Sequence, residues 1–326
     1  MHIAFLNAHG NFDPEDRYWT AHPDFGGQLV YVKEISQALG RMGHRVDIVT
    51  RRIDDPAWPG FADGRDGYPG EPNVRIVRIE CGGPGFQPKQ DLWPYLGPEW
   101  VPNIAAFYAG EGRMPDVATA HYADAGLSAA LWRERGGPRF TFTPHSLGAQ
   151  KLERLLVQEP AGLEGLDAEY HFARRIAAER VALGHAAQVV ISTDQERWDQ
   201  LAHTAYQGAV RPTDDRRFAV VPPGVNLHIF DAEVRAAEDQ RVAEHIETVL
   251  QREIPEERRD LPVVICSSRL EPKKNHLGLV LAFARSVRLQ QRANLVLVVR
   301  GTEDIHRGMA LKPGEQDVMD RVVDAC

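Results

Sequence analysis

Polar side chains follow several apolar runs of the chain, at the points where those runs end. Asn7 follows the run over residues 3–6, and His121, His145 and Arg269 follow later ones. Histidine and arginine can donate hydrogen bonds to hydroxyl and phosphate oxygens. If the runs are parallel strands of one sheet, these groups belong at its carboxyl edge, where open α/β sheets bind ligands. The pattern therefore predicts a polar ligand site assembled from separate segments.

Two glycines stand where the first of these loops is expected to become a helix. Gly26 and Gly27 precede residues 29–42, in which apolar residues recur near helical spacing. Glycine lets the backbone approach a ligand closely, and the first helical N–H groups are free to face it. Gln28 adds an amide that can donate to and accept from a polyol. A tight turn alone would also explain the glycines, but the polar surroundings favour a ligand site.

Cations accompany these segments although the chain is acidic. The 38 Lys and Arg against 46 Asp and Glu give a net charge of −8, which argues against nucleic acid or an anionic membrane as partner. Lys89, Lys151 and Arg174 would form a local cluster suited to a phosphate-bearing ligand. Arg175 stands four residues before Glu179, so a surface ion pair is its simpler explanation.

Some residues of this set could have ordinary structural roles instead of binding a ligand. Lys89 could be a solvated loop lysine, and His121 a histidine whose hydrogen bonds are satisfied at a strand end. Arg269 and Lys274 follow an apolar run that we expect to be a buried strand, and a helix is expected near Asn275. The two cations and the helix N-terminus could neutralise a departing diphosphate, and a plain pair of loop cations is the alternative.

Alternating strand and helix patterns predict an α/β fold, with a mostly parallel sheet covered by helices on both faces. The expected strands cover residues 2–7, 46–50, 74–79, 116–121, 139–143, 188–193 and 218–221. The expected helices cover residues 27–42, 99–110, 125–135, 167–183 and 194–202. Residues 60–72 are rich in Gly, Pro and Asp and are expected to form a surface loop.

The pattern breaks after residues 222–225 and then restarts. A charged helix is expected over residues 231–259, followed by a strand, a helix, a strand and a helix over residues 261–267, 275–288, 294–300 and 315–325. We therefore predict two domains, residues 1–230 and 231–326. Few residues remain for a second doubly wound domain. We expect that domain to be incomplete, the chain to be a truncation or fragment, and apolar sheet faces to be exposed.

Motifs of several other enzyme classes are missing. The sequence has no P-loop, no G-x-G-x-x-G in the first βα turn, no G-x-S-x-G elbow around Ser146, and neither H-E-x-x-H nor paired C-x-x-C for zinc. Cys81, Cys266 and Cys326 are scattered, which predicts reduced thiols in a cytoplasmic protein. We expect no signal peptide and no membrane span.

Several longer blocks of the sequence, taken together, resemble a known family. The most specific are HPDFGGQLVYVKE at residues 22–34 and HSLGAQK at residues 145–151; others lie at residues 11–14, 18–20, 50–53, 92–96, 121–124, 221–226, 267–270 and 273–275. From residue 1 to about residue 301 the chain closely resembles the bacterial sucrose-phosphate synthases. This resemblance implies a retaining glycosyltransferase of the GT-B fold, with two Rossmann-like domains. Many retaining enzymes of that fold share the block from Arg269 to Lys274.

The resemblance also implies a reaction, in which glucose passes from UDP-glucose or ADP-glucose to fructose 6-phosphate to give sucrose 6-phosphate. The N-terminal domain would hold the acceptor and the C-terminal domain the donor. The implied acceptor-binding residues are Gly26, Gly27, Gln28, Lys89, His121, Tyr122, Lys151, Arg174 and Arg175, with the phosphate on Lys89, Lys151 and Arg174. The implied catalytic residues are Gly27, His145, Arg269 and Lys274; Gly27, Arg269 and Lys274 would also bind the donor.

Further expectations concern cofactors, partners and alternatives. No metal or other cofactor is expected to be required, because the basic pair takes the metal's role, and Mg²⁺ would be at most a nonessential activator. A sucrose-phosphate phosphatase is a candidate partner. The family's glycine-rich donor loop would lie beyond residue 326. Two alternatives stay open: a mannosyltransferase using GDP-mannose on the same acceptor, and a non-catalytic sugar-phosphate-binding fragment. Sucrose synthase fits less well, because unphosphorylated fructose needs no cation cluster.

Overall fold

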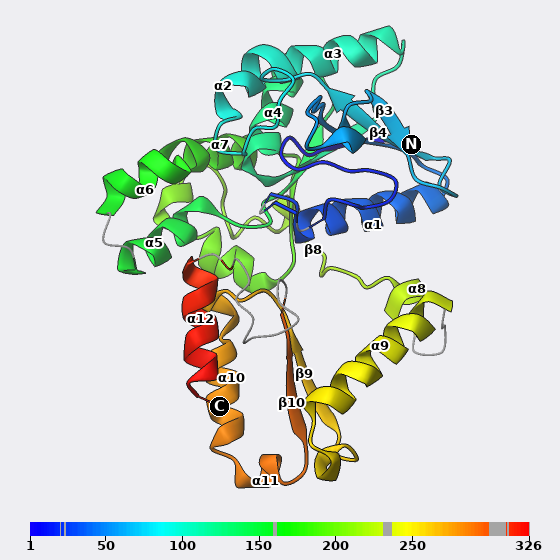
Figure 1. Cartoon of the computed structure of the whole chain (residues 1–326). Helices are drawn as coiled ribbons and strands as arrows, with labels where there is room; N and C mark the ends of the chain where they lie inside the picture. The colour runs from blue at the N-terminus through cyan, green and yellow to red at the C-terminus, as the bar shows by residue number, and fades with distance from the viewer. Residues whose placement is uncertain are drawn as a thin grey trace. The chain divides into compact units, whose positions relative to one another are not determined.

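The computed structural model describes residues 1–19, 21–22, 24–158, 162–230, 237–299, 311 and 313–325. The chain divides into two compact units, Met1–Asn226 and Leu227–Cys326 (Figure 1). The predicted domain boundary lies four residues further on, at residue 230. Parts of several predicted segments lie outside the described residues: residues 20 and 23 of the resembling blocks, residues 231–236 of the charged helix, residue 300 of the last strand, and Cys326.

An eight-stranded sheet forms the centre of the first unit, in the order β3-β4-β2-β1-β5-β6-β7-β8. Its strands are β1 (His2–Leu6), β2 (Arg45–Arg51), β3 (Arg65–Gly67), β4 (Val74–Ile79), β5 (Val117–His121), β6 (Phe140–Thr143), β7 (Gln188–Ile191) and β8 (Phe218–Val220). All neighbours pair in parallel except β3, which is antiparallel to β4. The predicted α/β class with a mostly parallel sheet is confirmed.

Helices cover both faces of this sheet (Figure 1). They are α1 (Gly27–Arg41), α2 (Trp93–Tyr95), α3 (Val101–Gly110), α4 (Tyr122–Glu134), α5 (Gly148–Gln158), α6 (Gly162–Tyr170) and α7 (Phe172–His185), with π turns at Leu96–Trp100 and Glu196–Gln200. Side chains of β1 alternate between two cores, as the pleat requires. Ala4 and Leu6 belong to the core under α3 and α4, whereas Ile3 and Phe5 belong to the core under α1.

Two local predictions need correction. Residues 60–72 were expected to form only a loop, yet Arg65 pairs with Val77 and Gly67 with Arg75 in the short edge strand β3. Its three residues are too few and too polar to show alternation, so backbone pairing alone defines the strand. The helix expected over residues 167–183 is two helices, because His171 has a left-handed φ of 51° that ends α6.

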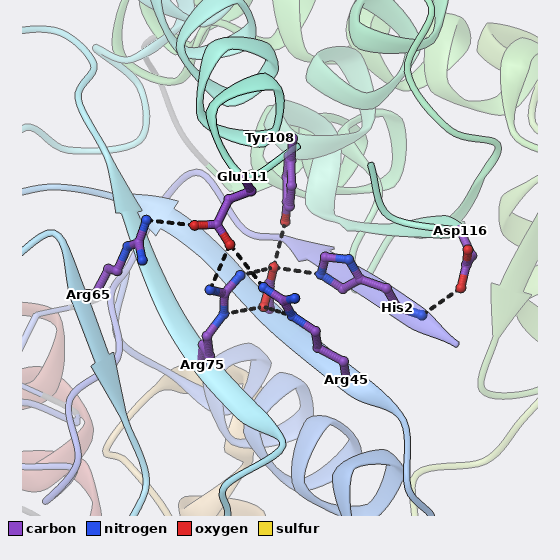
Figure 2. Close-up of polar contacts among 8 residues, drawn as sticks. His2, Arg45, Arg65, Arg75, Tyr108, Glu111 and Asp116 are labelled. Carbon is purple, nitrogen blue, oxygen red and sulfur yellow. Dashed lines mark hydrogen bonds and ion pairs between the residues drawn. The ribbon is translucent and has the colours of Figure 1, made fainter. Parts of the chain in front are cut away.

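A buried polar network ties the amino-terminal ends of three strands together (Figure 2). The carboxylate of Asp47, fully buried on β2, accepts two hydrogen bonds of 2.8 Å from Arg75 and one of 3.2 Å from the hydroxyl of Tyr108. His2 also binds it, at 2.7 Å. Arg75 reaches further to Glu111 at 3.0 Å. Because each partner comes from a different element, this network joins β1, β2, β4 and α3 at the amino-terminal ends of the strands.

The second unit contains the parallel pair β9 (Val263–Ser267) and β10 (Asn294–Val298). Its helices are α8 (Leu227–Phe230), α9 (Ala237–Glu253), α10 (His276–Ala284), α11 (Val287–Gln290) and α12 (Pro313–Val323). Strand β9 was expected to be buried, but Ile265 is 65% exposed and its neighbours Val263 and Val264 are also exposed. The small core, centred on Leu270, does not cover them. Exposure of apolar sheet surface was the other expectation for this region, and it is observed.

Candidate functional site

Asn7, His121 and His145, three of the polar residues predicted at strand ends, lie together in the first unit, whereas Arg269 belongs to the second unit. Strands β1, β5 and β6 are neighbours in the sheet, and their carboxyl ends lead to Asn7, His121 and His145. Gln28, in the first turn of α1, donates from Nε2 to Oδ1 of Asn7 at 2.6 Å and lies 3.4 Å from the carbonyl oxygen of His121. The start of α1 is thus attached to two strand ends.

The glycine pair begins α1. Gly26 is the N-cap residue and Gly27 the first helical residue. A Cβ on Gly27 would meet nothing within 4 Å, so the space beside it is open. Its φ is not among the positive values, so the backbone alone does not demand glycine there. Open space beside the free N–H groups of a helix start is what a ligand requires.

His121 and His145 form a hydrogen-bonded pair. Nδ1 of His121 lies 2.9 Å from Nε2 of His145, and Nε2 of His121 lies 3.1 Å from Oγ1 of Thr119. His121 is 1% exposed and stacks on Phe5, whereas His145 is open to solvent. Both ring nitrogens of His121 are therefore used within the protein. No ring nitrogen of His121 is left to donate to or accept from the acceptor directly.

The backbone is strained at the two strand ends that carry this pair. Tyr122 has a φ of 75° and His145 a φ of 57°, in the left-handed region that residues other than glycine rarely adopt. Each costs roughly 1–3 kcal/mol, and such residues cluster at binding sites. Tyr122 also begins α4, three residues earlier than predicted, so it lies in the first helical turn. No sequence signal marked either residue as left-handed.

The histidine pair is held neutral. Desolvation, with a smaller contribution from His145, lowers the pKa of His121 well below its usual 6.5. Desolvation of the ring against Tyr31 and His121, with His9 second, lowers the pKa of His145 to about 4. Both rings therefore carry a single proton at neutral pH.

This neutrality predicts a pH dependence of stability. Because the folded-state pKa values are depressed, the stability contributed by neutral rings is present above pH 6.5 and lost as the pH falls toward about 4. We expect the free energy of unfolding to fall more steeply over this window in the wild type than in His145→Asn, since asparagine tolerates the left-handed backbone. Urea titrations at several pH values test this, and parallel curves for the two proteins would contradict it.

Three cations surround one pocket beside these strand ends. The pocket is lined by Lys89, Gln90, Trp93, Tyr122, Asp124, Lys151, Tyr170 and Arg175. The Arg175 guanidinium carbon lies 4.5 Å from the centre of the Tyr122 ring, and Nζ of Lys89 lies 5.8 Å from it. Nζ of Lys151 lies 4.2 Å from the Tyr170 ring. Cations combined with aromatic faces suit a phosphorylated sugar.

Arg175, not Arg174, is the arginine at this pocket. Arg174 is exposed on α7 and is not among the lining residues. Arg175 is 4% exposed; it binds Glu179 at 2.9 Å and the carbonyl oxygen of Ser146 at 2.8 Å. The ion pair expected for Arg175 does form, but it is buried instead of lying on the surface. Adjacent helical residues point about 100° apart, and only the packing of α7 decides which one faces inward.

Glu179 organises the loop that carries His145. Its carboxylate is fully buried and accepts the N–H of Gly148 at 2.9 and 3.0 Å, the Nε–H of Arg175, and the hydroxyl of Tyr206. Gly148 is the first residue of α5, so the carboxylate caps that helix. Burial raises the pKa of Glu179, with Arg175 and these hydrogen bonds opposing the shift. The interaction joins α7 to the turn after β6.

Two carboxylates of the site were not assigned a role from the sequence. Asp24 binds Nζ of Lys89 at 2.6 Å, and Asp124 binds Nδ1 of His9 at 2.6 Å. Burial opposes ionisation of Asp24, but Lys89 and then His9 more than compensate and lower its pKa. Both aspartates lie in blocks that carried the resemblance, at residues 22–34 and 121–124. Their place in these blocks is the sequence signal that could have identified them.

The second cationic pair lies in the second unit. Nε of Arg269 pairs with Glu271 at 3.2 Å, and both Arg269 and Lys274 are exposed. Asn275, with a left-handed φ of 56°, precedes α10, and His276 accepts or donates a 3.0 Å hydrogen bond with Ser268. The cations thus stand immediately before a helix N-terminus, as expected. Their role toward a diphosphate stays a prediction.

Residues 26–224 match the glycosyl transferase 4-like domain family. The chain belongs to this family. Its glycosyl transferase 4-like domain therefore spans the glycine pair, the histidine pair and the cationic pocket. Among the described residues, no helix has the length and apolarity that crossing a membrane would require.

Curated relatives confirm the resemblance to sucrose-phosphate synthases. The chain is 40% identical over 308 residues to a probable sucrose-phosphate synthase of Thermosipho melanesiensis, covering 94% of this chain and 66% of the relative. It is 31% identical over 355 residues to a probable sucrose-phosphate synthase of Solanum tuberosum, covering 94% of this chain and 33% of that one. The chain thus spans about two thirds of the bacterial relative's length and a third of the plant relative's.

Solved structures confirm the fold. The sucrose-phosphate synthase of Thermosynechococcus elongatus superposes with a TM-score of 0.66 at 23% identity, covering all of this chain and 68% of that one. The catalytic domain of starch synthase IV from Arabidopsis thaliana gives a TM-score of 0.56 at 15% identity, over 91% of this chain and 68% of that one. The GT-B fold class predicted for the glycosyl transferase 4-like domain is supported by both.

Proposed function

We propose that the chain is part of a retaining hexosyltransferase that moves glucose from UDP-glucose or ADP-glucose to fructose 6-phosphate, forming sucrose 6-phosphate. The observation that supports this best is the pocket lined by Lys89, Lys151 and Arg175 together with Tyr122 and Tyr170. The 40% identity to a probable sucrose-phosphate synthase agrees with it. Fructose 6-phosphate and a nucleotide sugar are thus the proposed partners.

Each part of the site has a proposed role. The three pocket cations bind the phosphate, while the Tyr122 ring packs against the sugar. The open space beside Gly27 admits the reacting hydroxyl, and His145 contacts the transferred sugar. In the second unit, Arg269, Lys274 and the start of α10 neutralise the leaving diphosphate, so no metal ion is required and Mg²⁺ would act at most as a nonessential activator.

The test combines product formation with binding. The chain is incubated with fructose 6-phosphate and, in turn, UDP-glucose, ADP-glucose or GDP-mannose, while calorimetry measures binding of fructose 6-phosphate alone. Turnover with a glucose donor would support the proposed reaction; turnover with GDP-mannose alone would identify a mannosyltransferase. Binding without turnover would identify an acceptor-binding fragment. If a folded chain showed neither binding nor turnover, the proposed acceptor site would be wrong.

Replacing Lys151 with alanine should weaken binding of fructose 6-phosphate more than binding of fructose. Loss of one charge-assisted contact costs roughly 1.5–3 kcal/mol, or roughly 10- to 150-fold in Kd. Calorimetry with both sugars measures the difference. Arg154→Ala is the matched control, because Arg154 is an exposed cation on the same helix α5 that does not line the pocket. Equal losses for both sugars would rule out the phosphate role.

The compartment and the next reaction are also proposals. We place the protein in the reducing cytoplasm, because Cys81 and Cys266 are free thiols in the described part of the chain. The proposed product keeps the acceptor's phosphate, so a sucrose-phosphate phosphatase is a fitting partner.

A further inference from the structure

Three side chains form a continuous hydrogen-bonded row that ends at His145. Thr119 and His121 stand two residues apart on β5 and so share one face of the sheet. The Thr119 hydroxyl lies 3.1 Å from Nε2 of His121, and Nδ1 of His121 lies 2.9 Å from Nε2 of His145. Phe5 stacks on the His121 ring at 5.3 Å, and Tyr31 meets the edge of the His145 ring at 5.1 Å. Both rings are held in place.

The row can hold its protons in only two ways. A hydrogen bond between neutral imidazoles needs one N–H donor and one bare nitrogen. If His121 donates from Nδ1, its Nε2 accepts the Thr119 hydroxyl proton, and His145 keeps its own proton on Nδ1. If His145 donates instead, every bond reverses and Thr119 must accept from His121.

The first arrangement uses the Thr119 hydroxyl proton and the His121 Nδ1 proton within the row, and leaves only the Nδ1 proton of the exposed His145 without an acceptor among the described residues. In the second, the hydroxyl proton of Thr119 would need a further acceptor, and the described part of the chain offers none within hydrogen-bond distance. The lowered pKa values of both histidines keep each ring at one proton, so neither ring is doubly protonated at neutral pH.

We propose that Thr119 and His121 act as a relay that fixes His145 in the tautomer protonated on Nδ1. Across the described residues, this nitrogen has no protein partner, and His145 is open to solvent. His145 therefore presents an N–H donor, suited to a hydroxyl oxygen of a bound sugar. His121 is a positioning residue, since it is 1% exposed and acts through His145. The tautomer assignment does not depend on the proposed function, whereas the use of His145 in sugar binding rests on the proposed function.

Nitrogen NMR of the full chain, labelled with ¹⁵N-histidine, tests the relay directly. The two ring nitrogens of a neutral histidine have distinct shifts when protonated and bare, and loss of one set in His145→Asn assigns the His145 signals. We expect protonation on Nδ1 in the wild type and in Thr119→Ser, which keeps the hydroxyl. Thr119→Val has the same shape without the hydroxyl, and should shift His145 to a mixture containing the Nε2 tautomer.

Two results would overturn the relay: wild-type His145 protonated on Nε2, or no change in Thr119→Val. The signals of His2, bound to Asp47 at the opposite strand ends, report whether each variant is folded. The wild-type spectrum decides the tautomer even if the valine variant fails to fold. If the chain turns over, Thr119→Val should also lower kcat by roughly tenfold with little change in KM. Absence of turnover would count against the proposed function and leave the tautomer result unaffected.

Discussion

Replacement of Glu179 with alanine should lower the free energy of unfolding by roughly 3–5 kcal/mol, the usual cost of removing one partner of a buried ion pair. The variant leaves the Arg175 guanidinium buried beside an empty volume, and it removes the acceptor of the Gly148 N–H and the Tyr206 hydroxyl. The same change should weaken binding of fructose 6-phosphate, because Arg175 lines the pocket and Glu179 holds the turn after β6.

Urea unfolding and calorimetry on the same samples measure the two effects. Glu179→Gln keeps the side-chain volume and one acceptor oxygen, so we expect an intermediate loss of stability. Glu169→Ala is the control, since Glu169 is an exposed carboxylate on the neighbouring helix α6 and should change stability little. A stability loss no larger than that of the control would refute the role given to Glu179.

The second large effect is expected at Asp47, far from the candidate site. Asp47→Ala should also cost roughly 3–5 kcal/mol, because it leaves the partly buried Arg75 and the buried His2 and Tyr108 without their shared acceptor. Burial raises the pKa of Tyr108, with Asp47 contributing further, so the hydroxyl stays protonated and cannot replace the missing charge.

Chemical denaturation measures the free energy of unfolding of Asp47→Ala, and a binding assay measures its affinity for fructose 6-phosphate. Asp54→Ala removes a largely exposed carboxylate near Arg52 and should have little effect. If the variant Asp47→Ala remains folded under assay conditions, its affinity for fructose 6-phosphate should equal that of the wild type. A large loss of affinity in the folded variant would show that the two regions are coupled.

Much of the first unit could be predicted from hydrophobic periodicity, and the exceptions have local causes. β1 contains a continuous apolar run and β4 is rich in Val and Ile, so their patterns are strong. β3 is polar and short, and depends on pairing with β4. The break between α6 and α7 depends on one left-handed histidine, and neither composition nor spacing encodes that conformation. In the second unit, apolarity predicted strand β9, and the small number of residues available to cover it predicted exposed apolar surface.

The candidate site was predicted in its location more than in its detail. Topology alone sends the ends of β1, β5 and β6 to one edge, so Asn7, His121 and His145 could be grouped in advance. Arg174 was preferred to Arg175 for the phosphate, because the sequence does not show how α7 packs and hence which of the two faces the pocket. The burial of His121 was equally hidden, since strand-end histidines occur both as ligand contacts and as satisfied core residues. Both features depend on three-dimensional packing.

The position of the Asp47 network has an evolutionary consequence. It fastens the sheet at the amino ends of β1, β2 and β4, whereas the cationic pocket and histidine pair lie at the carboxyl ends of strands and in the loops and helices that follow. Substitutions that change the acceptor can therefore accumulate in those segments while the anchoring charges stay intact. A lineage could exchange one phosphorylated sugar for another without first acquiring compensating mutations elsewhere. Such a division would help one scaffold to diversify its sugar substrates.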